Sequence, residues 1–218
     1  MSFYEKLVMQ TQMNYSRYYS LYAAGKTPYA LSEKPALPYE EQIACLVKEI
    51  EEAECILIGG ASGLSAAGGG DFYYEDNASY RKYFGKFAEK YHFKGAFDGM
   101  MRRWDNREEF WGYLATFLHT TQTAEIREPY RDLDSLLKGK DFFVITTNQD
   151  TQFIKLYPEE KVAEIQGDHR FFQCADCCTD KTWDAVKPVS KMIKAMGEGT
   201  AVPTEWIPRC SHCGGEAF

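Results

Sequence analysis

Apolar residues recur along this chain with two different periods. Over 40–53 they return every three or four residues, the spacing of one helix face, at Ile43, Leu46, Val47 and Ile50. Short apolar runs follow at 55–59, 141–146 and 161–165, and their length is typical of strands buried in a parallel sheet. Helices that alternate with such strands predict an α/β fold with a doubly wound, Rossmann-like parallel sheet.

The stretch between the first two strands is helical in its pattern. Aromatic residues at helical spacing over 73–106 predict a small helical insert, in which they form either its core or a cover over a ligand cleft. Asp105 and Glu108 have the spacing of a helix N-cap and its reciprocal acid, ahead of an apolar face that extends to Leu118. A further short helix is predicted to end at Gly139.

A glycine-rich loop follows the first strand directly. Six of the twelve residues from Gly59 to Gly70 are glycine. A loop with so few side chains lets backbone N–H groups approach a pyrophosphate at the start of a helix, which indicates a dinucleotide site. The spacing differs from the common Gly-x-Gly-x-x-Gly fingerprint, so a plain glycine-rich turn is the alternative.

Polar residues follow the second and third predicted strands. Asn148 and Asp150 come after the second strand, and Gln166 comes after the third. Because the carboxyl ends of parallel strands form the edge at which such sheets bind ligands, these three residues are candidate site residues. Alternatively, Asn148 and Asp150 are turn residues that cap the next helix.

Composition limits the class of protein. The 218 residues carry a formal net charge of −7, which argues against general affinity for nucleic acid. The first residues lack the basic and apolar regions of a signal peptide, and no apolar run is long enough to span a membrane. We therefore expect a cytoplasmic protein that binds neither nucleic acid nor membrane. Residues 1–38 are polar and tyrosine-rich, and we expect them to form a helical extension.

Four cysteines in two pairs have the spacing of a zinc site. Cys174 and Cys177 are followed, after 32 intervening residues, by Cys210 and Cys213. Two such turns place four thiolates tetrahedrally around one ion, and a closed shell of four cysteines is typical of structural zinc. Cys178 does not match the spacing of the second pair, so we interpret it as a bystander.

Four motifs, in order and at matching offsets, resemble those of the sirtuins. The family's glycine loop, Gly-Ala-Gly-Ile-Ser followed by Gly-Ile-Pro-Asp-Phe-Arg, corresponds here to 60–64 and 68–73. Its Thr-Gln-Asn-Ile-Asp motif corresponds to 146–150, and its His-Gly pair to 166–167, eight residues before the first zinc cysteine. With the two cysteine pairs, the resemblance covers roughly residues 40–218.

The main departure from the family is at residue 166. In sirtuin deacylases a histidine accepts a proton there from a ribose hydroxyl of NAD, whereas the amide of Gln166 is no base near neutral pH. His169 is close in sequence, but three residues along a strand we expect it to point to the opposite face. With its degenerate glycine loop and N-terminal extension, the chain is similar to the macrodomain-linked class M sirtuins. That resemblance implies ADP-ribosylation of a lipoylated carrier protein like the glycine-cleavage H protein, a mark that a macrodomain partner reverses.

The resemblance also implies roles for the site residues. It implies that Asp150 holds the nicotinamide carboxamide and that Asn148 orients the ribose and the attacking group. It also implies that Gln166 forms a hydrogen bond with a ribose hydroxyl. Phe72 is implied to shield the cationic ribose. The implied NAD-binding residues are Gly60, Ala61, Ser62, Ala66, Asp71, Phe72, Asn148, Asp150 and Gln166. A degenerate, inactive site is the alternative for Gln166.

Two further expectations concern the extent and the activity of the chain. The C-terminal half of the sirtuin sheet has no counterpart here, so we expect a fragment. Its parts are the helical extension at 1–38, the first part of an NAD-binding domain at 39–170, and a zinc-binding module at 171–218. The predicted function is NAD-dependent ADP-ribosyl transfer to a protein, with NAD-dependent deacylation and non-catalytic binding of NAD or ADP-ribose as alternatives.

Overall fold

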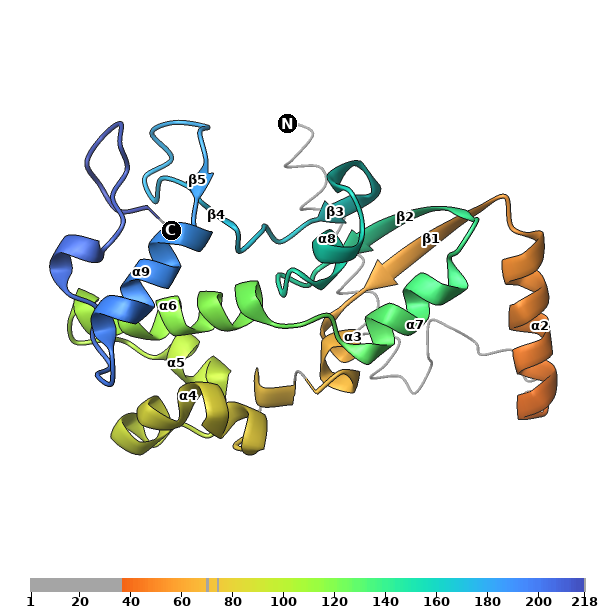
Figure 1. Cartoon of the computed structure of the whole chain (residues 1–218), viewed down its shortest axis with the longest axis horizontal. Coiled ribbons are helices and arrows are strands. Elements are labelled where there is room, and N and C mark those ends of the chain that lie inside the picture. Colours follow the sequence, from red (N-terminus) through yellow and green to blue (C-terminus); the bar gives the residue numbers. More distant parts are fainter. Residues whose placement is uncertain (1–36, 70, 74, 218) are drawn as a thin grey trace, which may run out of the picture. The chain divides into compact units, whose positions relative to one another are not determined.

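The computed structural model in Figure 1 describes residues 37–69, 71–73 and 75–217, apart from the side chain of Asp71. The chain divides into two compact units, Met1–Ala53 and Glu54–Phe218. Helix α2, Tyr39–Glu52, is the described element of the first unit, and its bounds agree with the predicted amphipathic helix. Most of the predicted N-terminal helical extension lies outside the described residues.

Three parallel strands form the sheet of the second unit. They lie in the order β1, Cys55–Gly60, then β2, Asp141–Thr146, then β3, Val162–Glu164. In register, residue 60 is paired with 146, and 146 with 164, so the three strands end level with one another (Figure 1). The predicted parallel α/β sheet is confirmed, and the loops after the strands meet at one edge of it.

Short helices follow β1 and β2 and pack beside the sheet. Helix α3, Ser62–Ala67, follows β1, whereas α7, Glu128–Leu136, precedes β2 and α8, Gln152–Leu156, follows it. Buried side chains join α7, β2 and the α8 region in one apolar core: Tyr130, Leu137, Val144, Phe153 and Tyr157. Burial of this apolar surface fixes the carboxyl end of β2 against the neighbouring helices.

The helical insert is present between η1, Asp71–Tyr73, and the long helix α6, Arg107–Thr123. It consists of α4, Ala78–Tyr91, and α5, Ala96–Met101. Most of the aromatic residues of the insert belong to a hydrophobic core and do not cover a ligand cleft. Several large rings from α4 and α6 are buried together in this core: Tyr80, Phe84, Phe87, Trp111, Tyr113 and Phe117.

Helix α6 has a different N-cap from the predicted one. Asn106 has extended backbone angles, and its side-chain oxygen accepts a hydrogen bond from the backbone N–H of Glu109 at 2.8 Å. The predicted cap of Asp105 and Glu108 is therefore wrong by one residue. The error arose because Asn106 and Glu109 have the same spacing and equally suitable side chains.

The C-terminal part of the chain packs on α6. Strand β4, Phe171–Phe172, pairs antiparallel with β5, Trp183–Asp184, and α9, Val186–Met196, packs on α6 (Figure 1). The 3₁₀ turn η3, Thr204–Trp206, follows. In the part of the chain that the structure describes, no helix combines the length and the apolar character needed to cross a membrane.

Gly112 lets α6 approach the loop after α9. A Cβ at this position would lie 1.9 Å from the carbonyl oxygen of Thr200. We expect Gly112→Ala to lower the free energy of unfolding by about 1–3 kcal/mol, because backbone rather than a flexible side chain must move. Gly85→Ala in α4 is the matched control, because an added Cβ there meets nothing within 4 Å. Since alanine favours a helix more than glycine does, we expect this variant to raise the free energy of unfolding by about 0.5–1 kcal/mol. Urea denaturation measures both changes, and equal stabilities would contradict the tight packing.

Candidate active site and metal centre

The carboxyl edge of the sheet borders a polar cavity of about 310 Å³. Its walls come from α3, η1, α5, α6, the loop after β2 and the turn after β3. The lining residues are Ser62, Ser65, Tyr73, Phe97, Met100, Phe117, Thr147, Asn148, Gln149, Asp150, Gln166 and His169. The structure therefore brings together four of the predicted site residues, Ser62, Asn148, Asp150 and Gln166.

Asp150 is the centre of a buried hydrogen-bond network. Its Oδ2 accepts hydrogen bonds from the hydroxyls of Ser65 at 2.5 Å and Tyr130 at 3.0 Å. The guanidinium of Arg127 lies 3.5 Å from the same oxygen, and the Arg127 and Asp150 side chains are only 12% and 4% exposed. Burial, and then the charge of Asp150, raise the pKa of Tyr130, so its hydroxyl stays a donor. These contacts hold the carboxylate of Asp150 in one orientation.

The turn alternative for Asp150 holds in part. Its second oxygen, Oδ1, accepts a hydrogen bond from the backbone N–H of Gln152, the first residue of α8, at 3.3 Å. However, the N-cap of α8 is Thr151, and no side chain caps this helix. Asp150 therefore stabilises the turn before α8 with one oxygen and contacts the cavity wall with the other.

Asn148 joins the loops after β1 and β2. Its Nδ2 donates to the carbonyl oxygen of Ala61 and to the hydroxyl of Tyr130, at 3.0 Å in both cases. Its backbone N–H donates to Oγ1 of Thr146 at 2.9 Å. Because both amide hydrogens are used, Asn148 can offer a ligand its carbonyl oxygen, which is an acceptor.

The glycine loop contributes fewer cavity residues than predicted. Ser62 and Ser65 line the cavity, whereas Ala66 is exposed and lies outside its wall. At Gly60 an added Cβ would lie 2.6 Å from the ring of Phe153, so glycine is required there by packing against α8. The structure gives Gly60 a packing role that the motif alone did not predict.

Phe72 does not line the cavity. Its side chain is 2% exposed and stacks on Phe84 in the aromatic core, with ring centroids 5.9 Å apart. The next residue, Tyr73, lines the cavity and stacks on Phe97. Tyr73 therefore reaches the cavity and Phe72 does not, because neighbouring side chains of a 3₁₀ turn point in different directions. The side chain of Asp71 lies outside the described part.

Gln166 and His169 both border the cavity, which corrects the prediction for His169. The two were expected on opposite faces of one strand. However, β3 ends at Glu164, and Gly167 has a φ of 99°, so the chain turns here and the alternation of a strand does not apply. The Nε2 of Gln149 donates to the backbone oxygen of Gln166 at 2.6 Å and fixes the turn.

His169 is held by helix α6. Its Nδ1 lies 3.0 Å from Oγ1 of Thr121, and its carbonyl oxygen accepts a hydrogen bond from Nε2 of Gln122 at 2.6 Å. The imidazole packs edge-on against the ring of Phe117. Burial lowers the pKa of His169 to about 4, so the imidazole is neutral at physiological pH.

Glu164, at the end of β3, links stability to pH. Burial, and then the charge of Asp168, raise the pKa of Glu164 from 4.5 to about 8. The folded chain binds the proton of Glu164 more tightly than the unfolded chain does. This proton therefore contributes its full amount to the free energy of unfolding below pH 4.5, and the contribution is lost as the pH rises through about 8. We expect Glu164→Gln, which cannot ionise, to be more stable than the wild type at about pH 8.5. Thermal unfolding from acid to alkaline pH measures this, and parallel profiles for the two proteins would contradict it.

A second, more apolar cavity of about 430 Å³ adjoins the first. Four residues border both cavities: Met100, Gln149, Gln166 and His169. The remaining wall comes from α6, the turn after β3, β4 and the loops of the cysteine module: Leu114, Leu118, Gly167, Asp168, Phe171, Phe172, Gln173 and Thr182. A polar and an apolar cavity therefore share one wall.

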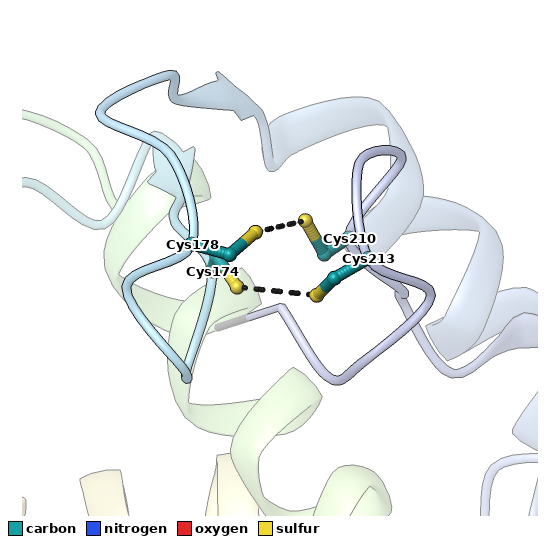
Figure 2. A group of neighbouring side chains, drawn as sticks. All are labelled: Cys174, Cys178, Cys210 and Cys213. Atoms are coloured by element: carbon teal, nitrogen blue, oxygen red, sulfur yellow. Dashed lines mark hydrogen bonds between the residues drawn. The ribbon is translucent and has the colours of Figure 1, made fainter.

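Four cysteine sulfurs point toward one another in the C-terminal module (Figure 2). The sulfurs of Cys174, Cys178, Cys210 and Cys213 all lie within 4.8 Å of one another. Cys177, predicted as a ligand, is exposed and outside this group, whereas Cys178, interpreted as a bystander, belongs to it. The prediction is corrected because residue 177 has a φ of 51°, a turn that directs the next side chain toward the second pair.

The spacing of the sulfurs fits a structural zinc ion. Tetrahedral zinc with Zn–S bonds of about 2.3 Å separates its sulfur ligands by about 3.8 Å. Two of the sulfur pairs are 3.5 and 3.7 Å apart. Backbone N–H groups of His212 and Gly215 each lie 3.4 Å from a sulfur of the second pair, where they stabilise thiolates.

Three residues of the network were not predicted from the sequence. Ser65 lies in the glycine-rich stretch, so its place in the cavity wall could have been inferred from that motif. Arg127 and Tyr130 lie at the start of α7, and nothing in their spacing distinguishes them from ordinary helix residues. They become recognisable only when α7 is packed beside the loop after β2.

The chain is similar to proteins named as ADP-ribosyltransferases. It is 30% identical over 175 residues to a protein ADP-ribosyltransferase of Staphylococcus aureus, and the match covers 79% of this chain and 54% of that protein. It is 29% identical over 187 residues to a probable bifunctional ADP-ribose hydrolase/ADP-ribosyltransferase of Fusarium oxysporum f. sp. cubense, covering 76% of this chain and 28% of that protein. The chain thus spans about half the length of the first relative and less of the second. No family model matches it.

A solved structure shows the fold. A triple variant of a Sir2 homologue, in complex with 2′-O-acetyl ADP-ribose, superposes with a TM-score of 0.52 at 16% identity. The superposition covers 80% of this chain and 60% of that chain. At this identity the likeness shows the fold alone, an α/β fold with a parallel sheet.

Proposed function

We propose that this chain, which has the sirtuin fold, catalyses the NAD-dependent transfer of ADP-ribose to a protein, with release of nicotinamide. The observation that carries the proposal is that Gln166 borders the same cavity as Asn148 and Asp150. An amide at this position can form a hydrogen bond with a hydroxyl group but cannot remove its proton near neutral pH. The names of the two relatives support the same activity, which we propose for the whole protein.

The polar cavity suits the cleavage of the bond between ribose and nicotinamide. That reaction develops positive charge on the sugar, so it needs positioning and electrostatics more than a strong base. We propose that Asp150 holds the nicotinamide carboxamide and that Asn148 orients the ribose through its carbonyl oxygen. We propose that Tyr73 excludes water from the sugar and that Gly60, Ala61 and Ser62 line the pyrophosphate.

The acceptor is proposed to enter through the second cavity. Its wall includes the apolar side chains of Leu114, Leu118 and Phe171, which suit an acceptor with an aliphatic arm. A lipoylated carrier protein like the glycine-cleavage H protein has such an arm and is the proposed acceptor. A cytoplasmic location and a macrodomain partner that reverses the modification complete the proposal.

The metal is proposed to be zinc in a structural role. Cys174, Cys178, Cys210 and Cys213 are the proposed ligands, because their sulfurs converge at the spacing that zinc requires. Four protein ligands leave no open coordination position. We therefore assign the ion no chemical role in the transfer.

The proposed function is tested with NAD labelled in its adenylate part and a lipoylated carrier protein. The full-length protein is expected to transfer the label to the carrier and to release an equal amount of nicotinamide. The same carrier without its lipoyl group is the control, and we expect it to accept less label. Absence of both label transfer and nicotinamide release would contradict the proposal.

NAD-dependent deacylation is the second candidate function, and the position of His169 favours it. An imidazole, the group that sirtuin deacylases use, borders the cavity, although burial lowers its pKa to about 4 and makes it a weak base. Deacylation predicts that an acetyl-lysine peptide stimulates nicotinamide release. Non-catalytic binding predicts saturable binding of ADP-ribose with no nicotinamide release, so these two measurements separate all three functions.

A further inference from the structure

His169 lies where the two cavities meet. Of the four residues that border both cavities, it is the one with a titratable side chain; the others are Met100, Gln149 and Gln166. In a transfer reaction the donor sugar and the acceptor have to come into contact at such a junction. A side chain at this place is therefore a neighbour of the sugar that is transferred.

The hydrogen bonds of Thr121 determine which nitrogen of His169 is protonated. The hydroxyl of Thr121 lies 2.9 Å from the carbonyl oxygen of Leu118 and 3.0 Å from Nδ1 of His169. A carbonyl oxygen only accepts, so the single hydroxyl proton of Thr121 is donated to Leu118. Oγ1 of Thr121 must then accept a hydrogen bond from Nδ1–H of His169. The lone pair of the imidazole is consequently on Nε2.

The surroundings of His169 make this lone pair a hydrogen-bond acceptor rather than a strong base. Burial lowers the pKa of His169 to about 4, although the charges of Asp168 and Asp150 act in the opposite direction. A group with so low a pKa removes protons poorly near neutral pH, but it accepts hydrogen bonds in its neutral form. A neutral ring also places no positive charge beside a sugar that becomes cationic.

The polar groups of the cavity suit a ligand that is rich in donors. Asn148 offers its carbonyl oxygen, and Gln166 offers an amide oxygen, in addition to Nε2 of His169. The ribose next to nicotinamide carries two hydroxyl groups, and each needs an acceptor when it is removed from water. Two residues of the junction, Gln166 and His169, can each supply one.

We propose that Nε2 of His169 accepts a hydrogen bond from one hydroxyl of the nicotinamide ribose and that Gln166 binds the other. His169 is then a specificity-determining residue: it touches the substrate, and no bond is made or broken at its ring. This inference rests on the proposed function and deepens it, because it names the part of NAD that the cavity reads. It does not follow from the family motif quoted above, which corresponds to residues 166–167 and does not include residue 169.

The test uses NAD and two analogues that lack the 2′- or the 3′-hydroxyl of the nicotinamide ribose. For the full-length wild type, we expect kcat/KM for nicotinamide release to fall by about 100-fold or more with the analogue that lacks the partner of His169, because a buried acceptor is left unpaired. His169→Phe keeps a planar ring without the acceptor. For this variant we expect kcat/KM with NAD to be lower than that of the wild type by a similar factor. Its kcat/KM with that analogue is expected to be little lower than its kcat/KM with NAD.

Two matched variants separate this role from a structural one. Gln166→Met is expected to show the same loss of discrimination, but toward the other hydroxyl. His169→Asn, which returns an acceptor, is expected to recover part of the activity that His169→Phe loses. Thermal unfolding of each variant shows whether the fold is kept.

The outcomes for His169 and for the proposed function are distinct. If His169→Phe discriminates between NAD and both analogues as strongly as the wild type, the role of His169 is overturned while the transfer reaction stands. If the wild type releases no nicotinamide, the proposed function is overturned, and calorimetry with ADP-ribose then decides on His169. A roughly 10-fold weaker Kd in His169→Phe supports the contact, and an unchanged Kd overturns it.

Discussion

Replacement of Asp150 by asparagine is expected to reduce nicotinamide release from NAD by about 100- to 1000-fold. The carboxylate accepts hydrogen bonds from Ser65 and Tyr130 and lies against the guanidinium of Arg127. If the new side chain turns its NH₂ group toward these donors, at least one of these contacts is lost. Tyr130 is then no longer fixed in the position in which its hydroxyl accepts a hydrogen bond from Asn148. The measurement is nicotinamide release by the full-length protein at saturating NAD.

Loss of activity by unfolding has to be separated from loss of the site. Removing one partner of a buried ion pair destabilises a protein by about 3–5 kcal/mol, so Asp150→Asn should also unfold at a lower temperature. The double variant Asp150→Asn, Arg127→Met removes the unpaired cation and is expected to regain stability but not activity. Asp141→Asn, at the exposed start of β2, is the control and should behave like the wild type. An active double variant would contradict the role of Asp150.

Serine at position 178 is expected to remove the metal, whereas serine at position 177 is not. Cys178 belongs to the group of four converging sulfurs, and Cys177 is exposed outside it. Because binding of structural zinc contributes on the order of 10 kcal/mol to folding, loss of one ligand should weaken zinc binding by more than about 100-fold and loosen the module. Elemental analysis of the purified variants gives the zinc content per chain, and thermal unfolding gives the stability.

The two variants are matched, because the same substitution, sulfur to oxygen, is made at adjacent positions. If Cys178→Ser kept its zinc and Cys177→Ser lost it, the ligand would be Cys177, as the spacing predicted. Removal of zinc from the wild type by a chelator should reproduce the phenotype of Cys178→Ser. A chelated wild type that unfolds like the untreated protein would show that the ion adds no stability.

The elements of the fold were largely predictable because each depends on local patterns. The three apolar runs became β1, β2 and β3, and the aromatic insert became α4 and α5. The motifs pointed to the sirtuins, and the structure confirms this at the level of the fold. The parallel arrangement follows from the alternation of helices and strands, which requires no knowledge of individual side-chain contacts. The strand order, β1, β2, β3, came from the structure.

The corrections concern the direction in which single side chains point. At residues 72 and 73, 166 and 169, and 177 and 178, the sequence identified the segment but not the side chain that faces the cavity or the cysteine group. Phe72 was taken from the family motif, His169 was judged from the strand period, and Cys177 was chosen by spacing. Gly167 and Cys177 have positive φ angles, and η1 is a 3₁₀ turn. In turns of this kind neither the strand nor the α-helix period applies, so spacing cannot tell which neighbour faces the site.

By itself, the sequence determined the α/β fold, the edge of the sheet that holds the site, the substitution at Gln166 and the presence of a cysteine site. Only the tertiary structure decided that His169 and Tyr73 border the cavity, that Phe72 does not, and that the sulfur of Cys178 rather than Cys177 lies with those of the other three cysteines. It also brought Arg127 and Tyr130 of α7 to Asp150. The physical reason is that local periodicity specifies which elements form, whereas the contacts of a site depend on turns and on packing between residues far apart in the chain.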